Sequence, residues 1–194
     1  MLSREDYLEV ARIHKDAISE GFLSTLGVNF LALLYESIDQ AGGCVLIVER
    51  TEGRIVGFVS GASGLGGVYK RMFRSWRRLL VALFPALLSP RKLYRIGETV
   101  FFSKKFENID VELPSYELLS IAVSKEFRGK GRAEQLFKSL VSYFHDSGVE
   151  KFKIVVGDAL VPAHKFYCRM GACPVARAEV HKGCGSIIYV CDVG

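Results

Sequence analysis

The fold follows from residues 116–133, which read YELLSIAVSKEFRGKGRA. The first eight are largely aliphatic and predict a strand over residues 116–123. The turn at residues 128–131 then opens a helix, whose apolar side chains recur at Leu136, Phe137, Leu140, Val141 and Phe144. Glycines let successive backbone N–H groups converge, and a helix start adds free N–H donors and a partial positive charge. Strand, turn and helix together predict an anion site that suits a pyrophosphate.

Two other phosphate-binding motifs do not fit this turn. A Walker loop needs Lys-Ser or Lys-Thr after its second glycine, but Gly131 is followed by Arg132. A dinucleotide fingerprint needs a third glycine where Glu134 stands. A glycine turn by itself is also compatible with a plain tight turn, so its surroundings have to decide between the two readings.

The elements on either side indicate an α/β domain. Upstream, a capping-box variant at Ser3 and Asp6 predicts a helix over residues 3–20, and a second helix follows Gly27. Runs at 44–50 and 54–60 predict an antiparallel hairpin. Downstream of the glycine turn and its helix we expect a strand at 151–156, a helix at 159–170, and strands near 174–181 and 186–190. This order predicts a mixed sheet with two neighbouring parallel strands.

Composition places the chain among single-domain globular proteins. It has 194 residues, 49% hydrophobic and 24% charged, enough for one domain over 1–194 with a sizeable core. No apolar run approaches the ~18 residues that cross a bilayer, and the start lacks a signal-peptide layout, so we expect a cytoplasmic location. The five cysteines are odd in number and form no C-x-x-C pair, which argues against a disulfide framework or a metal site.

Two signatures in the sequence resemble those of the GNAT acetyltransferases. Arg128-x-x-Gly131-x-Ala133 matches the family's [Gln/Arg]-x-x-Gly-x-[Gly/Ala], and residues 163–172 resemble A-x-x-[Phe/Leu]-Tyr-x-[Lys/Arg]-x-Gly-Phe. The resemblance implies a GNAT fold, which is a mixed, mostly antiparallel sheet flanked by helices, with two parallel strands splayed at the acyl-CoA site. Three features depart from the family pattern: the chain starts on the first helix without a preceding strand, Leu160 replaces a common Asn, and Ala172 replaces the closing Phe.

The resemblance also assigns roles to residues. The backbone of the turn would hold the acyl-CoA pyrophosphate, with the basic side chains adding positive charge, at Arg128, Gly129, Lys130, Gly131, Arg132 and Ala133. The strand before it would pair with the pantetheine arm at Ile121, Ala122 and Val123. Tyr167 matches the tyrosine that protonates the leaving thiolate, and Glu117 lies where some members carry a catalytic base. Glu98 and His164 are weaker candidates for the base.

The implied reaction moves an acetyl group from acetyl-CoA to a primary amine by direct attack. The implied acceptor is a small molecule such as an amino sugar. A peptide or protein acceptor, and an acyl-CoA-binding module without catalysis, are the alternatives. The implied partners are acetyl-CoA and the amine; neither a metal nor a nucleic acid is expected, and a homodimer remains open.

An inserted segment at about 63–113 lies outside the resemblance. No acidic residue occurs from 53 to 97, whereas nine basic residues do. The segment therefore carries more positive charge than the net charge of the whole chain, which is +5. The spacing of the basic residues at 70–78 predicts one broad helical face opposite Trp76 and its apolar neighbours. Residues 68–96 could therefore contact an anionic membrane surface peripherally, or form a helical pair that packs on the sheet and roofs the acceptor pocket. We favour the second, because amphipathic inserts more often bury their apolar face in protein.

Overall fold

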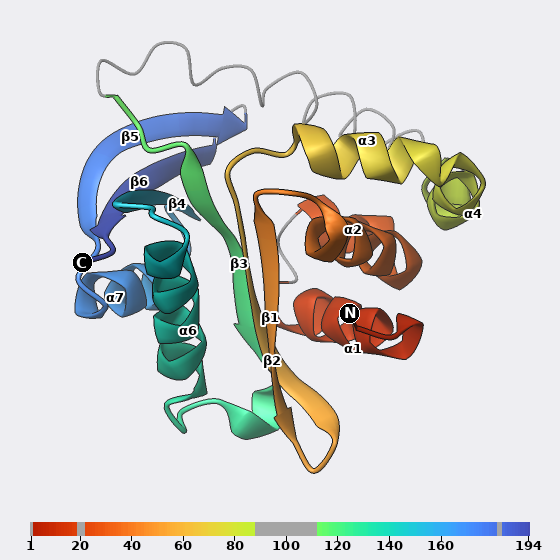
Figure 1. Ribbon diagram of the computed structural model, residues 1–194, viewed down its shortest axis with the longest axis horizontal. Helices are drawn as coiled ribbons and strands as arrows, with labels where there is room; N and C mark the ends of the chain where they lie inside the picture. Colours follow the sequence, from red (N-terminus) through yellow and green to blue (C-terminus); the bar gives the residue numbers. More distant parts are fainter. Residues whose placement is uncertain (1, 19–21, 88–111, 182–183) are drawn as a thin grey trace.

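The computed structural model describes residues 2–18, 22–87, 112–181 and 184–194. The helices are α1 (Arg4–Ala17), α2 (Val28–Gln40), α3 (Gly66–Arg74), α4 (Trp76–Leu87), α6 (Arg132–Asp146) and α7 (Val161–Arg169), with the 3-10 turns η1 (Phe22–Leu26) and η3 (Lys125–Phe127). The strands are β1 (Cys44–Thr51), β2 (Arg54–Ala62), β3 (Tyr116–Val123), β4 (Lys151–Gly157), β5 (Cys173–His181) and β6 (Cys184–Asp192). One sheet lies between two helical layers, with α1 and α2 on one face and α6 and α7 on the other (Figure 1). The predicted α/β architecture is confirmed.

The sheet contains one parallel pair, as the sequence predicted. Its order is β1-β2-β3-β4-β6-β5, and every neighbouring pair except β3 and β4 is antiparallel. The pairing of β3 with β4 covers only Tyr116, Glu117 and Leu118 of β3. Beyond Leu118, β3 pairs with β2 alone. The two parallel strands therefore splay apart toward their C-terminal ends, as expected of the family fold.

A β-bulge marks the point where β3 leaves β4. Ser60 of β2 pairs with Ser120 and Gly61 pairs with Leu118, so Leu119 is an extra residue without a direct partner. A bulge bends its strand and increases the local twist. It also resets the side-chain alternation, because Leu118 packs into the core under α6 while Ser120 is hydrogen-bonded to Tyr35 of α2. The bulge thus opens the sheet next to Glu117.

The layer formed by α1 and α2 begins at the caps that the sequence predicted. The Ser3 hydroxyl accepts a hydrogen bond from the Asp6 N–H at 3.2 Å, and the Asp6 carboxylate accepts one from the Ser3 N–H at 2.8 Å. Helix α2 starts directly after Gly27. Helix α1 ends at Ala17, because Ile18 is its C-cap and has non-helical backbone angles, whereas the sequence predicted a helix to residue 20. Apolar side chains of both helices pack on Ile55, Phe58 and Ala62 of β2, which fixes this layer against the sheet.

On the opposite face, two glycines of β2 allow α6 to approach the sheet closely. A Cβ on Gly61 would lie 2.7 Å from Phe144 and 3.0 Å from Leu140. A Cβ on Gly57 would lie 3.0 Å from Leu136. Any larger residue at these positions would push α6 away from the sheet. Because the glycine turn leads into α6, this contact also positions the predicted anion site.

The inserted segment departs from its prediction in two respects. Residues 68–78 do not form one helix, because α3 ends at Arg74, Ser75 caps it, and α4 starts at Trp76. The main contacts of the pair are with α2 and η1, not with the sheet. The prediction of one continuous basic face was wrong, because helical spacing continues through a one-residue break without revealing it. Residues 88–111, including Glu98, lie outside the described residues.

Candidate active site

The glycine turn joins the end of β3 to the start of α6. Gly129 has a φ of +74° and Gly131 a φ of +73°, in the left-handed region that favours glycine. Gly131 is the N-cap of α6 and makes no side-chain cap, so the first N–H groups of the helix have no cap from that residue. A Cβ at either glycine would meet nothing within 4 Å. The turn therefore presents backbone donors on an open surface, which is what an anion needs.

The three basic side chains of the turn are engaged differently. Arg128 donates from Nε to the Val123 carbonyl at 3.0 Å, which ties the turn to the end of β3. Arg132 forms an ion pair with Glu49 of β1. Lys130 lies with Nζ 5.1 Å from the centre of the Phe127 ring. Arg128 and Arg132 thus hold the turn in place, whereas Lys130 has no ion pair with a residue in the described part of the chain.

The stretch of β3 predicted to meet the pantetheine arm lies in the splayed region. Ile121, Ala122 and Val123 pair with β2 on one side and have no ladder with β4 on the other. Ala122 and Val123 are buried, whereas Ile121 is half-buried. An unpaired strand edge can accept an extended ligand as an added strand.

Glu117 lies at the closed end of the splay, beside Lys153 of β4. The two residues are partners in the parallel ladder, and Lys153 Nζ is 3.9 Å from Glu117 Oε2. Lys153 also donates to the Pro114 carbonyl at 2.6 Å. Burial raises the pKa of Glu117 above its usual value, and the positive charge of Lys153 opposes that rise. Such a carboxyl can take up a proton closer to neutral pH than an exposed one.

Tyr167 lies on the other face of the sheet. Its ring packs with Phe137, Phe166 and Tyr189, and its side chain is 6% exposed. Burial raises the pKa of the Tyr167 phenol well above its usual value, so the hydroxyl keeps its proton at neutral pH. Tyr116 and Leu118 belong to this same core, so alternation along β3 places Glu117 on the α1–α2 face. The two catalytic candidates therefore flank the sheet from opposite sides.

His164, a weaker candidate for the base, has both ring nitrogens engaged. Nε2 is 3.1 Å from the Gly157 carbonyl, which can only accept, so Nε2 carries the hydrogen. Nδ1 is 2.8 Å from the Tyr189 hydroxyl and in the neutral ring accepts from it. These bonds connect α7 to β4 and β6, and they favour a structural role for His164.

One ion pair that sequence reasoning missed links the two signature helices. Arg169 of α7 lies with Nη2 2.5 Å from Glu134 Oε1 in the first turn of α6. Glu49, the partner of Arg132, was also missed. Both contacts join residues far apart in the chain, and the acidic partners carry no local signal beyond their charge.

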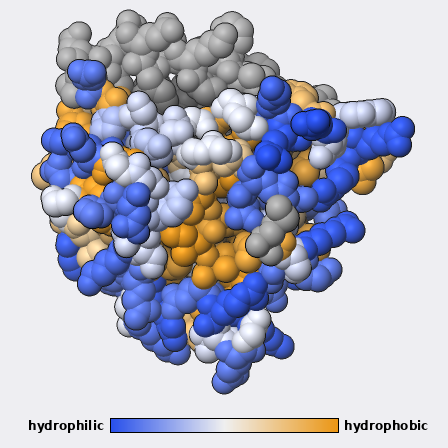
Figure 2. Space-filling model, in the orientation of Figure 1, coloured by the Kyte–Doolittle hydropathy of each residue, from blue (hydrophilic) through white to orange (hydrophobic). Residues whose placement is uncertain are grey.

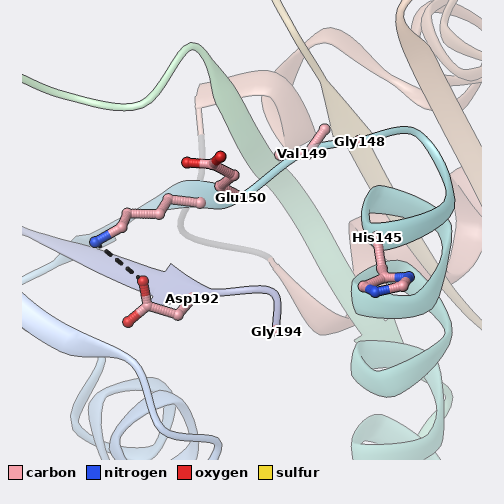
Figure 3. Close-up of a pocket in the computed structure, with 7 residues that line it drawn as sticks. His145, Gly148, Val149, Glu150, Asp192 and Gly194 are labelled. Carbon is pink, nitrogen blue, oxygen red and sulfur yellow. Dashed lines mark ion pairs between the residues drawn. The ribbon is translucent and has the colours of Figure 1, made fainter.

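One hollow of the described surface lies away from the candidate site. It measures about 440 Å³ and is lined by His145, Gly148, Val149, Glu150, Lys151, Asp192 and Gly194 (Figure 3). It lies at the C-terminal end of α6, whereas the glycine turn lies at its N-terminal end. Within the described residues no cluster of potential metal ligands occurs, and no helix there is long and apolar enough to cross a membrane.

Solved structures of similar fold were compared with the chain. A protein from Desulfovibrio desulfuricans described as an acetyltransferase of the GNAT family has a TM-score of 0.64 and 16% identity, over 100% of this chain and 96% of that one. An N-acetyltransferase from Staphylococcus aureus Mu50 has a TM-score of 0.63 and 15% identity, over 100% and 96%. An aminoglycoside 6′-N-acetyltransferase complexed with coenzyme A has a TM-score of 0.58 and 9% identity, over 95% and 89%. At these identities the likeness shows the fold.

Sequence comparison gives the family. No curated protein matches the chain. The family model described as "Acetyltransferase (GNAT) family" matches residues 9–172, which is most of the 194 residues and includes the glycine turn and α7. The chain therefore belongs to the GNAT family of acetyltransferases.

Proposed function

We propose that this protein transfers the acetyl group of acetyl-CoA to a primary amine by direct attack. The observation that carries the proposal is the opening between β3 and β4. It has the glycine turn at one end, Glu117 at the other, and Tyr167 on the α6 face of the sheet. A group bound where the two strands part would lie between Glu117 on one face of the sheet and Tyr167 on the other, which suits a reaction between two separately bound substrates.

Acetyl-CoA would bind along β3 with its pyrophosphate at the turn. Backbone N–H groups at Gly129, Lys130, Gly131, Arg132 and Ala133 would donate to the phosphate oxygens, and the Lys130 ammonium would add charge. The unpaired edge at Ile121, Ala122 and Val123 would pair with the pantetheine amides. The thioester would then lie near the start of the splay, within reach of both faces.

The amine would attack the thioester carbonyl from the α1–α2 face. A carbon–nitrogen bond forms, and collapse of the tetrahedral intermediate breaks the carbon–sulfur bond. The Glu117 carboxylate takes the proton that the amine must lose, because a protonated amine has no free electron pair. The Tyr167 hydroxyl donates a proton to the departing thiolate. The nitrogen loses a second proton as the amide forms, and this proton restores the Tyr167 phenol through solvent, so that the products are an amide and free CoA thiol.

The acceptor is proposed to be a small molecule with a primary amine, and an amino sugar is the first to test. Glu117 supports an amine, because a carboxylate attracts the ammonium form and can then deprotonate it. A peptide amine is the second candidate. A binding module without turnover is the third; the buried phenol of Tyr167 and the raised pKa of Glu117 favour catalysis over it.

A thiol-release assay tests the proposal. Purified protein is mixed with acetyl-CoA and a panel of amino sugars, aminoglycosides, polyamines and short peptides, and free CoA is measured with a thiol reagent. We expect amine-dependent release with at least one class, and its loss in Gly131→Asp. Acetyl-CoA binding in calorimetry without turnover of any amine would support the binding module. Absence of acetyl-CoA binding would refute the proposal.

A further inference from the structure

The outer side of α3 and α4 exposes large apolar side chains that belong to neither of the two core clusters. Their exposed fractions run from 48% for Tyr69 to 72% for Val81. Trp76, Leu80 and Phe84 follow one another at four-residue spacing, so they form a single ridge along α4. We call this the α3–α4 surface; it comprises Tyr69, Phe73, Trp76, Leu80, Val81 and Phe84. An apolar surface of this kind marks a contact site.

The inner side of the same helices packs against the rest of the protein. Val68 and Met72 of α3 and Ala82 of α4 are buried, and they hold the pair against α2 and η1. Arg78 pairs with Glu36 of α2 through two hydrogen bonds of 3.0 and 2.6 Å. Packing within the protein therefore accounts for the apolar residues on the inner side of each helix. It does not account for those of the α3–α4 surface.

Positive charge borders the α3–α4 surface. Lys70, Arg74 and Arg77 are exposed, and none has an ion pair with a residue in the described part of the chain. Arg77 lies 5.5 Å from the centre of the Trp76 ring. No acidic residue occurs between 53 and 97 to offset these charges. Figure 2 shows apolar and hydrophilic residues side by side at the α4 end of the molecule.

We infer that the α3–α4 surface docks on an anionic membrane surface. Lysine and arginine are attracted to acidic lipid headgroups, Trp is favoured at the headgroup level, and Leu, Val and Phe gain by entering the acyl boundary. Helix α4 has 12 residues and is too short to cross a bilayer, so it lies in the interface. Basic residues beside an apolar ridge distinguish this occupant from a neutral protein partner, which would gain nothing from the unpaired charges.

Docking in this way leaves the acetyl-CoA entrance in water. Helix α3 begins four residues after β2 ends, and the last residue of β2, Ala62, pairs with Glu117. The other end of that ladder pairs Gly57 with Val123, which leads into the glycine turn. In Figure 1, α3 lies at the same end of the sheet as the start of β3, and α6 begins at the opposite end. The membrane would thus lie at the Glu117 end of the site, and the glycine turn would face away.

Trp76 reports on this contact directly, because it is the only tryptophan in the sequence. The full-length protein is titrated with vesicles of phosphatidylcholine alone and of phosphatidylcholine mixed with phosphatidylglycerol. We expect a blue shift of Trp76 emission and co-sedimentation with the mixed vesicles only, both reversed by high salt. Acetyl-CoA affinity, measured by calorimetry, should be unchanged on the vesicles. No blue shift at low salt overturns the inference, whatever the acetyltransferase assay gives.

Two variants and a control separate the contributions. Lys70→Gln/Arg74→Gln/Arg77→Gln should weaken vesicle partitioning by roughly 100-fold, because each basic residue near an acidic surface contributes about fivefold. Leu80→Ser/Phe84→Ser should reduce the blue shift without removing the attraction. The control, Arg4→Gln/Arg12→Gln/Lys15→Gln, removes three exposed charges from α1 and should change partitioning little. If the control and the variant lose vesicle partitioning equally, the attraction depends only on the net charge of the protein, and the assignment to the α3–α4 surface is overturned.

Other occupants of the surface give different results. Trp76 already shielded from acrylamide in vesicle-free, monomeric protein would mean that another part of this chain covers the surface. A concentration-dependent dimer that Leu80→Ser/Phe84→Ser abolishes, with no vesicle response, would assign the surface to a second copy. Either result overturns membrane docking. Thermal unfolding of every variant confirms that α3 and α4 remain folded.

Discussion

Acidification is expected to destabilise the fold through His14, which lies in the layer between α1 and the sheet. Its side chain is 2% exposed, its Nδ1 is 2.5 Å from the Tyr35 hydroxyl, and its ring stacks on Phe58. Within the described residues, Nε2 is buried and has no hydrogen-bond partner. A protonated ring would need two acceptors in this apolar setting. Burial therefore lowers the pKa of His14 to about 4.

The sign and size of the effect follow from linkage. The pKa of His14 is about 4 in the folded protein, whereas in the unfolded chain it is near 6.5. Neutral His14 therefore makes its full contribution to stability above pH 6.5. The contribution falls as the pH drops from 6.5 toward 4. The pKa difference corresponds to about 3 kcal/mol in total, of which about 2 kcal/mol should be lost by pH 5. That is a large part of the ~5–15 kcal/mol by which domains are stable.

Urea unfolding between pH 7.5 and pH 4.5 measures this contribution. His14→Phe keeps a ring against Phe58 but cannot take up a proton. Its free energy of unfolding should fall about 2 kcal/mol less than that of the wild type between pH 7.5 and pH 5. His145→Asn, a change at an exposed position near the end of α6, should follow the wild-type curve. If His14→Phe and the wild type lose stability in parallel, the reasoning about His14 is refuted.

Four further predictions concern the site and its support. Gly131→Asp should abolish measurable acetyl-CoA binding in calorimetry, because a carboxylate would meet the pyrophosphate and φ at +73° strains a side chain by about 1 kcal/mol; undiminished affinity would place the pyrophosphate elsewhere. Tyr167→Phe should lower kcat by about 10²-fold or more with little change in acetyl-CoA affinity, and an unchanged kcat would leave Tyr167 with packing alone. Lys153→Met removes the charge that lowers the pKa of Glu117, so the acidic limb of the rate profile should move to higher pH, whereas Glu117→Gln should abolish that limb; a limb that ignores both changes would point to another base. Gly61→Val should lower the free energy of unfolding by about 1–3 kcal/mol or more, because its side chain would meet Phe144, and near-wild-type stability in urea would show that α6 can move away at little cost.

Local chemistry made much of the site predictable. The glycine turn between β3 and α6 was predicted from the sequence, because Gly129 and Gly131 lie between a strand pattern and a helix pattern; both take left-handed φ values that few other residues tolerate. The Ser3 cap was equally readable, since its partner lies three residues away. The contacts of Arg128 and Arg132 could not be predicted from the sequence. Three basic residues in one turn are locally alike, yet Arg132 pairs with Glu49 of β1, which is 83 positions away in the chain.

By itself, the sequence determined the order of the strands and helices, the parallel pair and the family, because periodicity and the two signatures depend on residues close together in the chain. Tertiary structure alone decided where the sheet opens. The bulge at Leu119 depends on the register of β2, which no local pattern contains. It also decided which side of α3 and α4 is covered. Helical spacing separates the faces of a helix, but burial of Val68 and exposure of Phe73 depend on where α2 lies, and that is set by contacts between segments distant in sequence.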